Sequence, residues 1–290
     1  MKKGALNGAP FFVRRLWCMS APRRGSALVR TFVWPVVFAA VFTSSARSQD
    51  VSGSTRAKLI VVNTLIGGAT AGITAAINHR PIWRAFVYGS AGGAVVFGGK
   101  CLVAQQHSVT DWIGRETVAI GSSVVANAAA GRPALSRVAL PLGPVRFYRD
   151  NAAKRIRLKL DVAQVIGAAY LASERTSSMD WKESLEHGGL IVFTRGGSAM
   201  EVAGAIRIWD TESGRMLAHE QTHAVQNEFL SIAVEEPLES WLLPHLPGGK
   251  LVNRYFDVGI LTPVWGWINS LIPAHQRPWE KEANAFDSSC

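Results

Sequence analysis

The sequence predicts an α+β fold in which helices come first, a small and mostly antiparallel sheet follows, and further helices end the chain. Three observations indicate this order. Long apolar stretches of helical length occupy most of residues 59–130. Short runs rich in β-branched and aromatic residues lie between residues 138 and 209, and a helical run follows at residues 215–230. Separate groups of helices and strands are typical of α+β proteins.

The composition predicts a folded domain and argues against a nucleic-acid partner. Of the 290 residues, 48% are hydrophobic and 18% are charged, which provides enough apolar surface for a buried core. The net charge of +10 would suit nucleic-acid binding, but seven of the 31 basic residues lie in residues 1–46, which contain no acidic residue. Without that segment, 24 basic residues stand against 21 acidic ones, and no basic stripe remains.

Residues 1–46 have the pattern of a bacterial-type secretory signal peptide. Basic residues precede the apolar run Thr31–Phe42, and the small residues Ser44 and Ala46 follow it, as cleavage after Ala46 requires. The run of roughly 12 residues is too short to span a bilayer as a helix. A chain that starts at Met19 would have a signal of ordinary length. We therefore expect an exported protein of the cell envelope, periplasmic or membrane-associated, with an uncleaved anchor as the alternative.

Export also changes how many cysteines the mature protein would keep. Cys18 lies within the predicted signal peptide, which leaves Cys101 and Cys290. Two isolated thiols do not form a disulfide framework, and the sequence contains no Cys-x-x-Cys metal pair. Whether Cys101 and Cys290 pair with each other stays open.

Residues 47–134 are expected to form a helical, glycine-rich region. Residues 59–78 carry no charge, and a second apolar stretch covers 85–99. Glycines recur at four-residue spacing in both, which lets two helix backbones approach closely. The pattern fits a helical hairpin in or on a membrane, and equally a hairpin that is buried in protein. A further helix is predicted at 108–130, because Gly131–Pro133 would end it.

The next part of the chain is predicted to form short strands. Four runs are rich in β-branched, aromatic or alternating residues, namely 138–149, 155–162, 189–194 and 205–209. In the second run, basic side chains alternate with Ile156, Leu158 and Leu160, which is the period of a half-buried strand. Residues 210–214 form a predicted turn with helix-capping residues, and the helical run 215–230 follows.

This helical run contains the sequence His219-Glu220-Gln221-Thr222-His223. Residues at positions i and i+4 share one face of a helix, so both imidazoles can bind one metal ion. The Glu220 side chain is rotated away from the helix face that carries the two histidines, and it can reach a water molecule on the metal instead. A Zn²⁺ ion suits two neutral imidazoles and a carboxylate, with a fourth position left for water.

A second acidic element lies 57 residues after His223, at Trp279–Phe286. His-Glu-x-x-His followed by Glu-x-x-Ala-Asp on a separate helix resembles the gluzincin zinc metallopeptidases. The resemblance implies a zincin-like core within residues 135–290, with Glu280 as the third zinc ligand. It also implies that Asn284, where the family has Asp, accepts a hydrogen bond from the first zinc histidine. Glu282 is the alternative third ligand.

The extension of the motif to Gln226 is also similar to the HExxHxxQ form of bacterial envelope-associated peptidases. The resemblance covers only residues 212–230 and 278–287. The metzincin pattern is excluded, since it requires Gly and His where this chain has Gln226 and Phe229. The sequence also lacks a Gly-x-Ser-x-Gly nucleophile elbow and a phosphate-binding loop.

The resemblance implies a Zn²⁺-dependent metallopeptidase that hydrolyses a peptide or protein substrate of the cell envelope, with Glu220 taking the proton of the zinc-bound water. Candidates for stabilising the transition-state oxyanion are His245, Tyr255 and His275. The apolar segment 258–272 contains Trp265 and Trp267, and fits a membrane-interface wedge, a substrate-cleft wall or plain core. The alternative function is a non-catalytic structural or interaction protein of the envelope, whose metal site is vestigial or only stabilises the fold.

Overall fold

A computed structural model describes residues 53–105, 107–196, 198–209, 214–273 and 276–289. The predicted signal peptide, residues 1–46, lies outside this part of the chain, as do His275 and Cys290. Within it the protein is α+β, as the sequence predicts.

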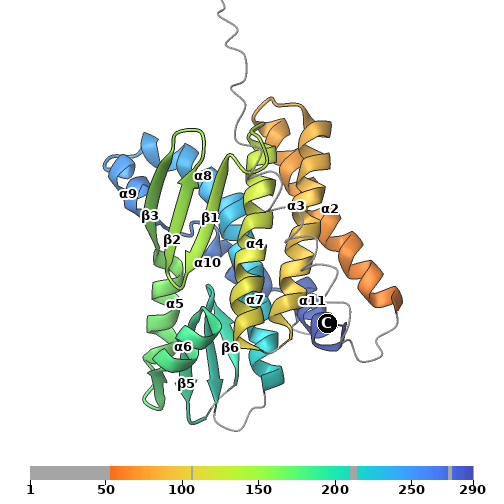
Figure 1. Cartoon of the computed structure of the whole chain (residues 1–290). Helices are drawn as coiled ribbons and strands as arrows, with labels where there is room; N and C mark the ends of the chain where they lie inside the picture. The colour runs from red at the N-terminus through yellow and green to blue at the C-terminus, as the bar shows by residue number, and fades with distance from the viewer. Residues whose placement is uncertain (1–52, 106, 197, 210–213, 274–275, 290) are drawn as a thin grey trace, which may run out of the picture. The chain divides into compact units, whose positions relative to one another are not determined.

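Three long helices form one layer (Figure 1). They are α2 (Gly53–Ile77), α3 (Ile82–Val103) and α4 (Ser108–Ala129), which matches the predicted hairpin and the helix that follows it. α3 lies between the other two and packs against both. A Cβ atom at Gly93 would collide with the Asn63 carbonyl oxygen of α2, and one at Gly99 would lie 2.6 Å from the Gly114 oxygen of α4. Glycine is therefore required where these backbones touch.

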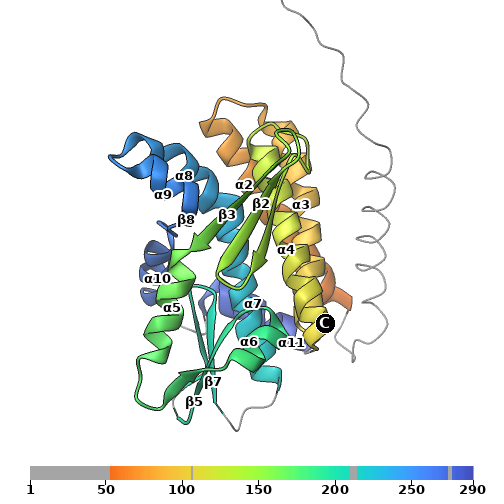
Figure 2. The ribbon, with the colours of Figure 1, turned by 60° about the vertical axis from the view of Figure 1, so that its left-hand side comes forward.

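The hairpin shares its core with the helix that carries the His-Glu-x-x-His sequence. That helix is α7 (Gly214–Leu230), and its Val225 and Phe229 pack in one cluster with Ala71 of α2, Val96 of α3 and Val118 of α4. α7 contacts α4 on one side and the short strands β6 and β7 on another (Figure 2). The glycine-rich region and the metal-motif helix are thus packed as one body.

The strands form two four-stranded sheets, whereas the sequence predicted a single, mostly antiparallel one. Sheet A has the order β1-β2-β3-β8 and sheet B the order β4-β5-β7-β6. β3 pairs with β8 in parallel, and β5 with β7, so each sheet is mixed. Four of the six pairings among the described strands are antiparallel, as predicted, but the strands divide between two sheets, because short runs of strand-forming residues do not reveal which strands pair. The bounds are β1 (Arg137–Leu142), β2 (Val145–Asp150), β3 (Arg155–Asp161), β4 (Ser177–Met179), β5 (Leu190–Thr194), β6 (Met200–Val202), β7 (Ala205–Trp209) and β8 (Phe256–Asp257).

Shorter helices connect and cover the sheets. α5 follows β3 directly and α6 precedes β5 (Figure 1). α7 continues without a break through a π-helical turn, η2, into α8. The remaining bounds are α5 (Val162–Ala172), α6 (Trp181–His187), η2 (Ser231–Glu235), α8 (Glu236–Leu242), η3 (Leu243–His245), α9 (Gly249–Tyr255), α10 (Thr262–Ser270) and α11 (Pro278–Ser289).

Sheet A buries its charged face. Arg146 of β2 pairs with Asp161 and Asp257, while Lys159 of β3 donates to Asp257 over 2.8 Å. Tyr148 also donates to Asp257 over 2.6 Å. Of the charged half of the predicted β3 alternation, Lys159 and the following Asp161 are buried, whereas Arg155 at the start of the strand is exposed. These ion pairs hold the charged side chains inward, and the apolar side chains point outward.

α2 and α3 are the helices of the described residues that are long and apolar enough to cross a membrane. About three fifths of the apolar window of α3 (61%) is buried inside the protein, but only 33% of that of α2. α3 therefore has the surroundings of a core helix, and α2 exposes one apolar face. Cys101 near the end of α3 is disulfide-bonded, and both other cysteines lie outside the described residues.

Candidate metal centre

α7 presents the two histidines of the motif side by side. Their Nε2 atoms lie 3.2 Å apart, and the two rings meet edge to face. The side chains sit one helical turn apart on the face of α7 that looks toward α11, which is the arrangement expected for residues at i and i+4.

Glu280 enters from the first turn of α11. Its Oε2 lies 3.4 Å from Nε2 of His219 and 3.3 Å from Nε2 of His223. The helix begins at Pro278, and proline in a first turn fixes the direction in which a helix starts. Hydrogen bonds from His219 and then His223 hold the pKa of Glu280 below its ordinary value. Glu280, which follows His223 by 57 residues and His219 by 61, thus meets both histidines at one point.

The spacing of these three ligand atoms fits a tetrahedral metal ion. Bonds of 2.0–2.1 Å at tetrahedral angles separate ligand atoms by about 3.3–3.4 Å. The three separations in the protein are 3.2, 3.3 and 3.4 Å. His219, His223 and Glu280 therefore make a preformed set of two nitrogens and one oxygen.

Gln226 fixes the tautomer of His223. The Gln226 amide nitrogen donates to the Glu282 carboxylate over 2.7 Å, and this carboxylate can only accept when ionised. The amide oxygen therefore faces His223, whose Nδ1 lies 2.8 Å away and must carry the proton. Because Nδ1 keeps its proton, Nε2 is the nitrogen of His223 that remains for a metal ion. Nε2 faces His219 and Glu280, and its hydrogen bond to Glu280 would be given up when an ion binds.

Glu282 belongs to a different network from Glu280. Lys100 of α3 donates to Glu282 Oε1 over 2.7 Å and Asn63 of α2 donates to the same atom over 2.8 Å. Burial raises the pKa of Glu282, but the charge of Lys100 and the hydrogen bonds from Lys100, Asn63 and Gln226 outweigh it and hold the pKa below its ordinary value. Glu282, the alternative third ligand, thus connects α11 to the helical hairpin. It also accepts the hydrogen bond from Gln226, the residue that orients His223.

The other predicted site residues lie apart from this centre or outside the described residues. Asn284 is one turn beyond Glu280 on α11 with an exposed side chain, and its bond to His219 stays a prediction. His245 faces the Trp241 carbonyl oxygen over 2.8 Å, and Tyr255 ends α9. Neither His245 nor Tyr255 is among the described residues that line the cleft beside the ligands. His275 lies outside the described residues.

A cleft of about 650 Å³ opens beside the three ligands, and Glu220 lines it. The Glu220 side chain is 6% exposed, and burial raises its pKa to about 7, although both histidines oppose the shift. A carboxylate with such a pKa can accept a proton near neutral pH and give it back. Glu220 thus borders the open side of the ligand set.

Besides α7 and α11, which carry the candidate ligands, two segments wall this cleft. Met200, Glu201 and Val202 of the edge strand β6 line one side, and Trp265 of α10 lines another. Trp265 meets Trp279 edge to face, so part of the apolar segment 258–272 is a cleft wall, whereas Trp267 is 63% exposed. Sequence reasoning missed Glu201, which accepts a hydrogen bond from Asn227 over 2.5 Å, because no motif surrounds it.

α8 anchors the wall that α10 supplies. The fully buried Glu239 accepts hydrogen bonds from the backbone N–H groups of residues 258, 259 and 260 at 2.9, 2.6 and 3.2 Å. Glu235 accepts a further one from Thr262 over 3.1 Å. The continuous helix α7–η2–α8 therefore carries the two candidate histidine ligands and also holds the segment that leads into α10.

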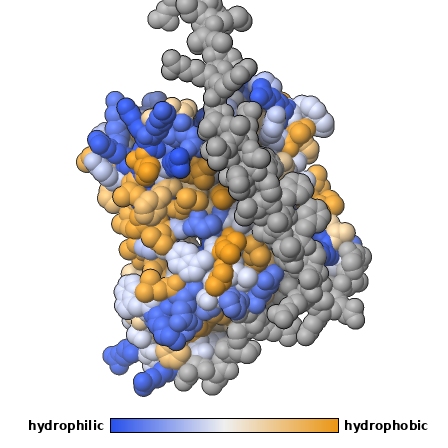
Figure 3. All heavy atoms as spheres, viewed as in Figure 1, coloured by the Kyte–Doolittle hydropathy of each residue, from blue (hydrophilic) through white to orange (hydrophobic). Residues whose placement is uncertain are grey.

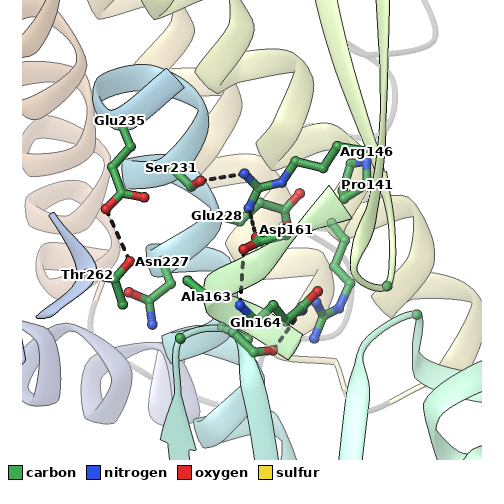
Figure 4. A pocket seen from close by; sticks show the side chains of 16 residues that line it. Pro141, Arg146, Asp161, Ala163, Gln164, Asn227, Glu228, Ser231, Glu235 and Thr262 are labelled. Carbon is green, nitrogen blue, oxygen red and sulfur yellow. Dashed lines mark hydrogen bonds and ion pairs between the residues drawn. The ribbon is translucent and has the colours of Figure 1, made fainter. Parts of the chain in front are cut away.

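A second cavity lies behind α7, as a close view shows (Figure 4). It measures about 20 Å³, which is room for about one water molecule. Glu228 and Ser231 extend into it beside Arg146 and Asp161 (Figure 4). Glu228 Oε1 has no hydrogen-bond partner among the described residues, and burial raises the pKa of Glu228 to about 7. This cavity is suited to a bridging water rather than to a substrate.

A second group of potential ligands lies on α6. Glu183, Glu186 and His187 have ligand atoms within 4.8 Å of one another. His187 Nδ1 is however 2.5 Å from Asp111, and the group lines neither cavity. Comparisons with protein families, with curated proteins and with solved structures find no match for the chain.

Proposed function

We propose that this protein is an exported, zinc-dependent metallopeptidase of the cell envelope, with a zincin-like core and a gluzincin-type site. The observation that carries the proposal is the convergence of His219, His223 and Glu280 on one point with tetrahedral spacing, next to Glu220 in an open cleft. The limited resemblance of residues 212–230 and 278–287 to gluzincins points the same way.

The donor set supports zinc in a catalytic rather than a structural role. Structural zinc sites use four protein ligands, whereas catalytic sites use three and leave one position open. Two imidazoles and one carboxylate are a ligand set of the catalytic kind. Bound Zn²⁺ would supply Lewis-acid polarisation of a carbonyl group and lower the pKa of water toward neutrality.

The residues of the chain then have distinct tasks. Glu220 accepts the proton of the attacking water and passes it to the leaving amine. Gln226 keeps His223 in the tautomer that binds metal. Among the residues lining the cleft, Arg277 supplies a permanent positive charge, suited to a carboxylate or a carbonyl oxygen of the substrate.

A peptide is the substrate that suits the cleft. β6 is at the edge of sheet B, so the backbone groups on its unpaired side are available to an extended chain. Trp265 and Trp279 offer an apolar surface for a substrate side chain. A strand–cleft–helix arrangement of this kind supports the zincin-like core.

Two features support a place in the envelope. Residues 1–46 have the pattern of a signal peptide, and α2 exposes a long apolar face that lipid could cover. The rival function is an envelope structural protein with a metal that only stabilises the fold. The incomplete ligand set and the cleft beside it favour the enzyme.

Replacement of Glu220 by Gln tests the proposal. We expect the Glu220→Gln protein to retain one zinc per chain and to lose hydrolysis by roughly 10²–10⁴-fold, because the proton acceptor is gone. Zinc content and cleavage of a quenched fluorescent peptide library are measured together. Glu186→Gln, an exposed glutamate on α6, is the control and keeps both properties. Equal cleavage by the Glu220→Gln protein would support the structural role instead.

A further inference from the structure

Sheet A has an outer face that is apolar except for Arg149. The register places Leu140, Phe147 and Leu158 side by side, and Leu142, Val145 and Leu160 in the next row. The third row holds Val138, Arg149 and Ile156. Leu142, Ile156 and Leu158 are 49%, 70% and 52% exposed. An exposed apolar surface of this extent marks an interaction site.

The buried charges prevent the sheet from turning this face inward. A slip of one residue would bring Ile156 and Leu158 inward and expel Lys159, whose side chain is fully buried against Asp257. Arg146 and Tyr148 are tied to the same aspartate from the neighbouring strand. The apolar face is therefore a fixed feature of the fold and not a consequence of a weak register.

Positive charge borders the apolar face at one end and beside β3. Arg149 lies within it, and Lys154 and Arg155 are exposed at the turn between β2 and β3. Lys250 and Arg254 are exposed on α9, which packs beside β3. The view in Figure 3 has hydrophobic surface over sheet A, with hydrophilic surface above it at the end that carries the β2–β3 turn.

Acidic side chains are nearly missing from this surface. Of the three acidic residues in β1–β3, α9 and β8, Asp161 and Asp257 are buried. The third, Asp150, accepts a hydrogen bond from the Ala153 backbone and closes the turn. Tyr255 and Phe256 add exposed aromatic rings beside the cations. An apolar face with a basic rim and aromatic side chains is the composition of protein surfaces that lie on anionic lipid.

We propose that the outer face of sheet A docks on an anionic lipid bilayer. The aliphatic side chains enter the boundary between headgroups and acyl chains, and the lysines and arginines of the rim contact the headgroups. The inference is independent of the metal centre and goes beyond the peptidase proposal. A second copy of the chain fits less well, because a symmetric contact would bring two basic rims together.

The test is flotation of the full-length chain, without added zinc, with vesicles of phosphatidylcholine alone or mixed equally with phosphatidylglycerol. We expect wild type to float with the anionic vesicles, and Leu140→Ser/Leu158→Ser to bind at least about tenfold less, because two apolar side chains that would enter the bilayer are replaced by polar ones. Lys154→Glu/Arg155→Glu, which leaves the packing untouched, is expected to remove the preference for anionic lipid.

The control is Trp181→Ser/Leu185→Ser on α6, where the side chains are 65% and 72% exposed outside this face. All variants share the same N-terminal segment and α2, so a difference between them reports on sheet A. Binding of both sheet A variants equal to that of the control would overturn the proposal. So would light scattering that shows a wild-type dimer and a monomeric Leu140→Ser/Leu158→Ser protein, because the occupant would then be a second copy.

Discussion

At the scale of single residues, one hydrogen bond decides which nitrogen of His223 faces the ligand set. Lys100 donates to Glu282, Glu282 accepts from the Gln226 amide nitrogen, and the Gln226 amide oxygen accepts a hydrogen bond from Nδ1–H of His223. Each step is determined by the one before, because an ammonium group only donates and a carboxylate only accepts. The orientation of a metal ligand thus depends on a cation in the helical hairpin.

This chain of hydrogen bonds from Lys100 to His223 predicts the effect of Gln226→Ala. Without the amide oxygen, His223 can rotate and change tautomer, so we expect the zinc affinity to fall by about 10–100-fold. Competition with a zinc chelator measures the affinity, and the unfolding midpoint of the zinc-free protein is the parallel readout. A purely structural role would lower the midpoint and leave the affinity as in wild type.

The proximity of the three candidate ligands could be predicted from the sequence, but the chain of hydrogen bonds from Lys100 to His223 could not. The spacing of His219 and His223 and the family resemblance of Glu280 pointed to one metal site, and the structure brings these three together. Lys100 is a lone cation at the end of an apolar stretch, 182 residues before Glu282. Nothing local in the sequence distinguishes such a buried partner from a helix-ending lysine.

At the scale of elements, close backbone contact holds the three-helix layer together. Glycines of α3 meet Asn63 of α2 on one side and Gly114 and Gly121 of α4 on the other. α7 packs on this layer, and Glu282 of α11 is bound to α2 and α3. A change in the helix spacing is therefore transmitted to α11.

Two glycine substitutions distinguish the effect of close backbone contact on stability from the effect of helix propensity. Gly93→Ala is expected to destabilise the protein by about 1–3 kcal/mol, because a Cβ there collides with the Asn63 carbonyl oxygen. Gly72→Ala, where the nearest atom would be 3.6 Å away, is expected to be neutral or to stabilise by about 0.5–1 kcal/mol. Urea unfolding measures both. Equal effects of the two substitutions would contradict the packing argument.

The long helices were predictable, whereas the sheets were not. α4 and α7 agree with their predicted bounds within a residue or so, since apolar periodicity and breaking residues mark them clearly. The short elements β4, β6 and α6 escaped prediction, because three to seven residues carry little periodic signal. The alternation in β3 gave the period but not the buried face, since the buried Asp257, from a distant segment, pairs with Lys159 on the charged side.

At the scale of the whole molecule, the interior contains many ionisable groups. Glu116 of α4 and Glu228 of α7 lie near each other and near the buried Arg115. Burial, followed by repulsion from Glu228, raises the pKa of Glu116 to about 8. The folded state therefore keeps a proton on Glu116 that the unfolded chain releases above about pH 4.5.

The pH dependence of stability follows from that shift. Because the folded state binds the extra proton, the contribution of Glu116 declines as the pH rises from about 4.5 to about 8. We expect Glu116→Gln to gain stability relative to wild type across this range and to hold the gain above it. Urea unfolding at about pH 5 and about pH 9 measures the difference. A constant difference at both pH values would mean that Glu116 titrates normally.

The central claim is that one divalent ion binds between α7 and α11. Titration of the zinc-free protein with Zn²⁺ tests it most directly, with Glu280→Ala and Glu183→Ala compared with wild type. We predict one zinc per chain in wild type and in Glu183→Ala, and an affinity more than about a hundredfold weaker in Glu280→Ala, which lacks a direct ligand. Zinc binding that survives in Glu280→Ala but is lost in Glu183→Ala would place the ion on α6 and contradict the account.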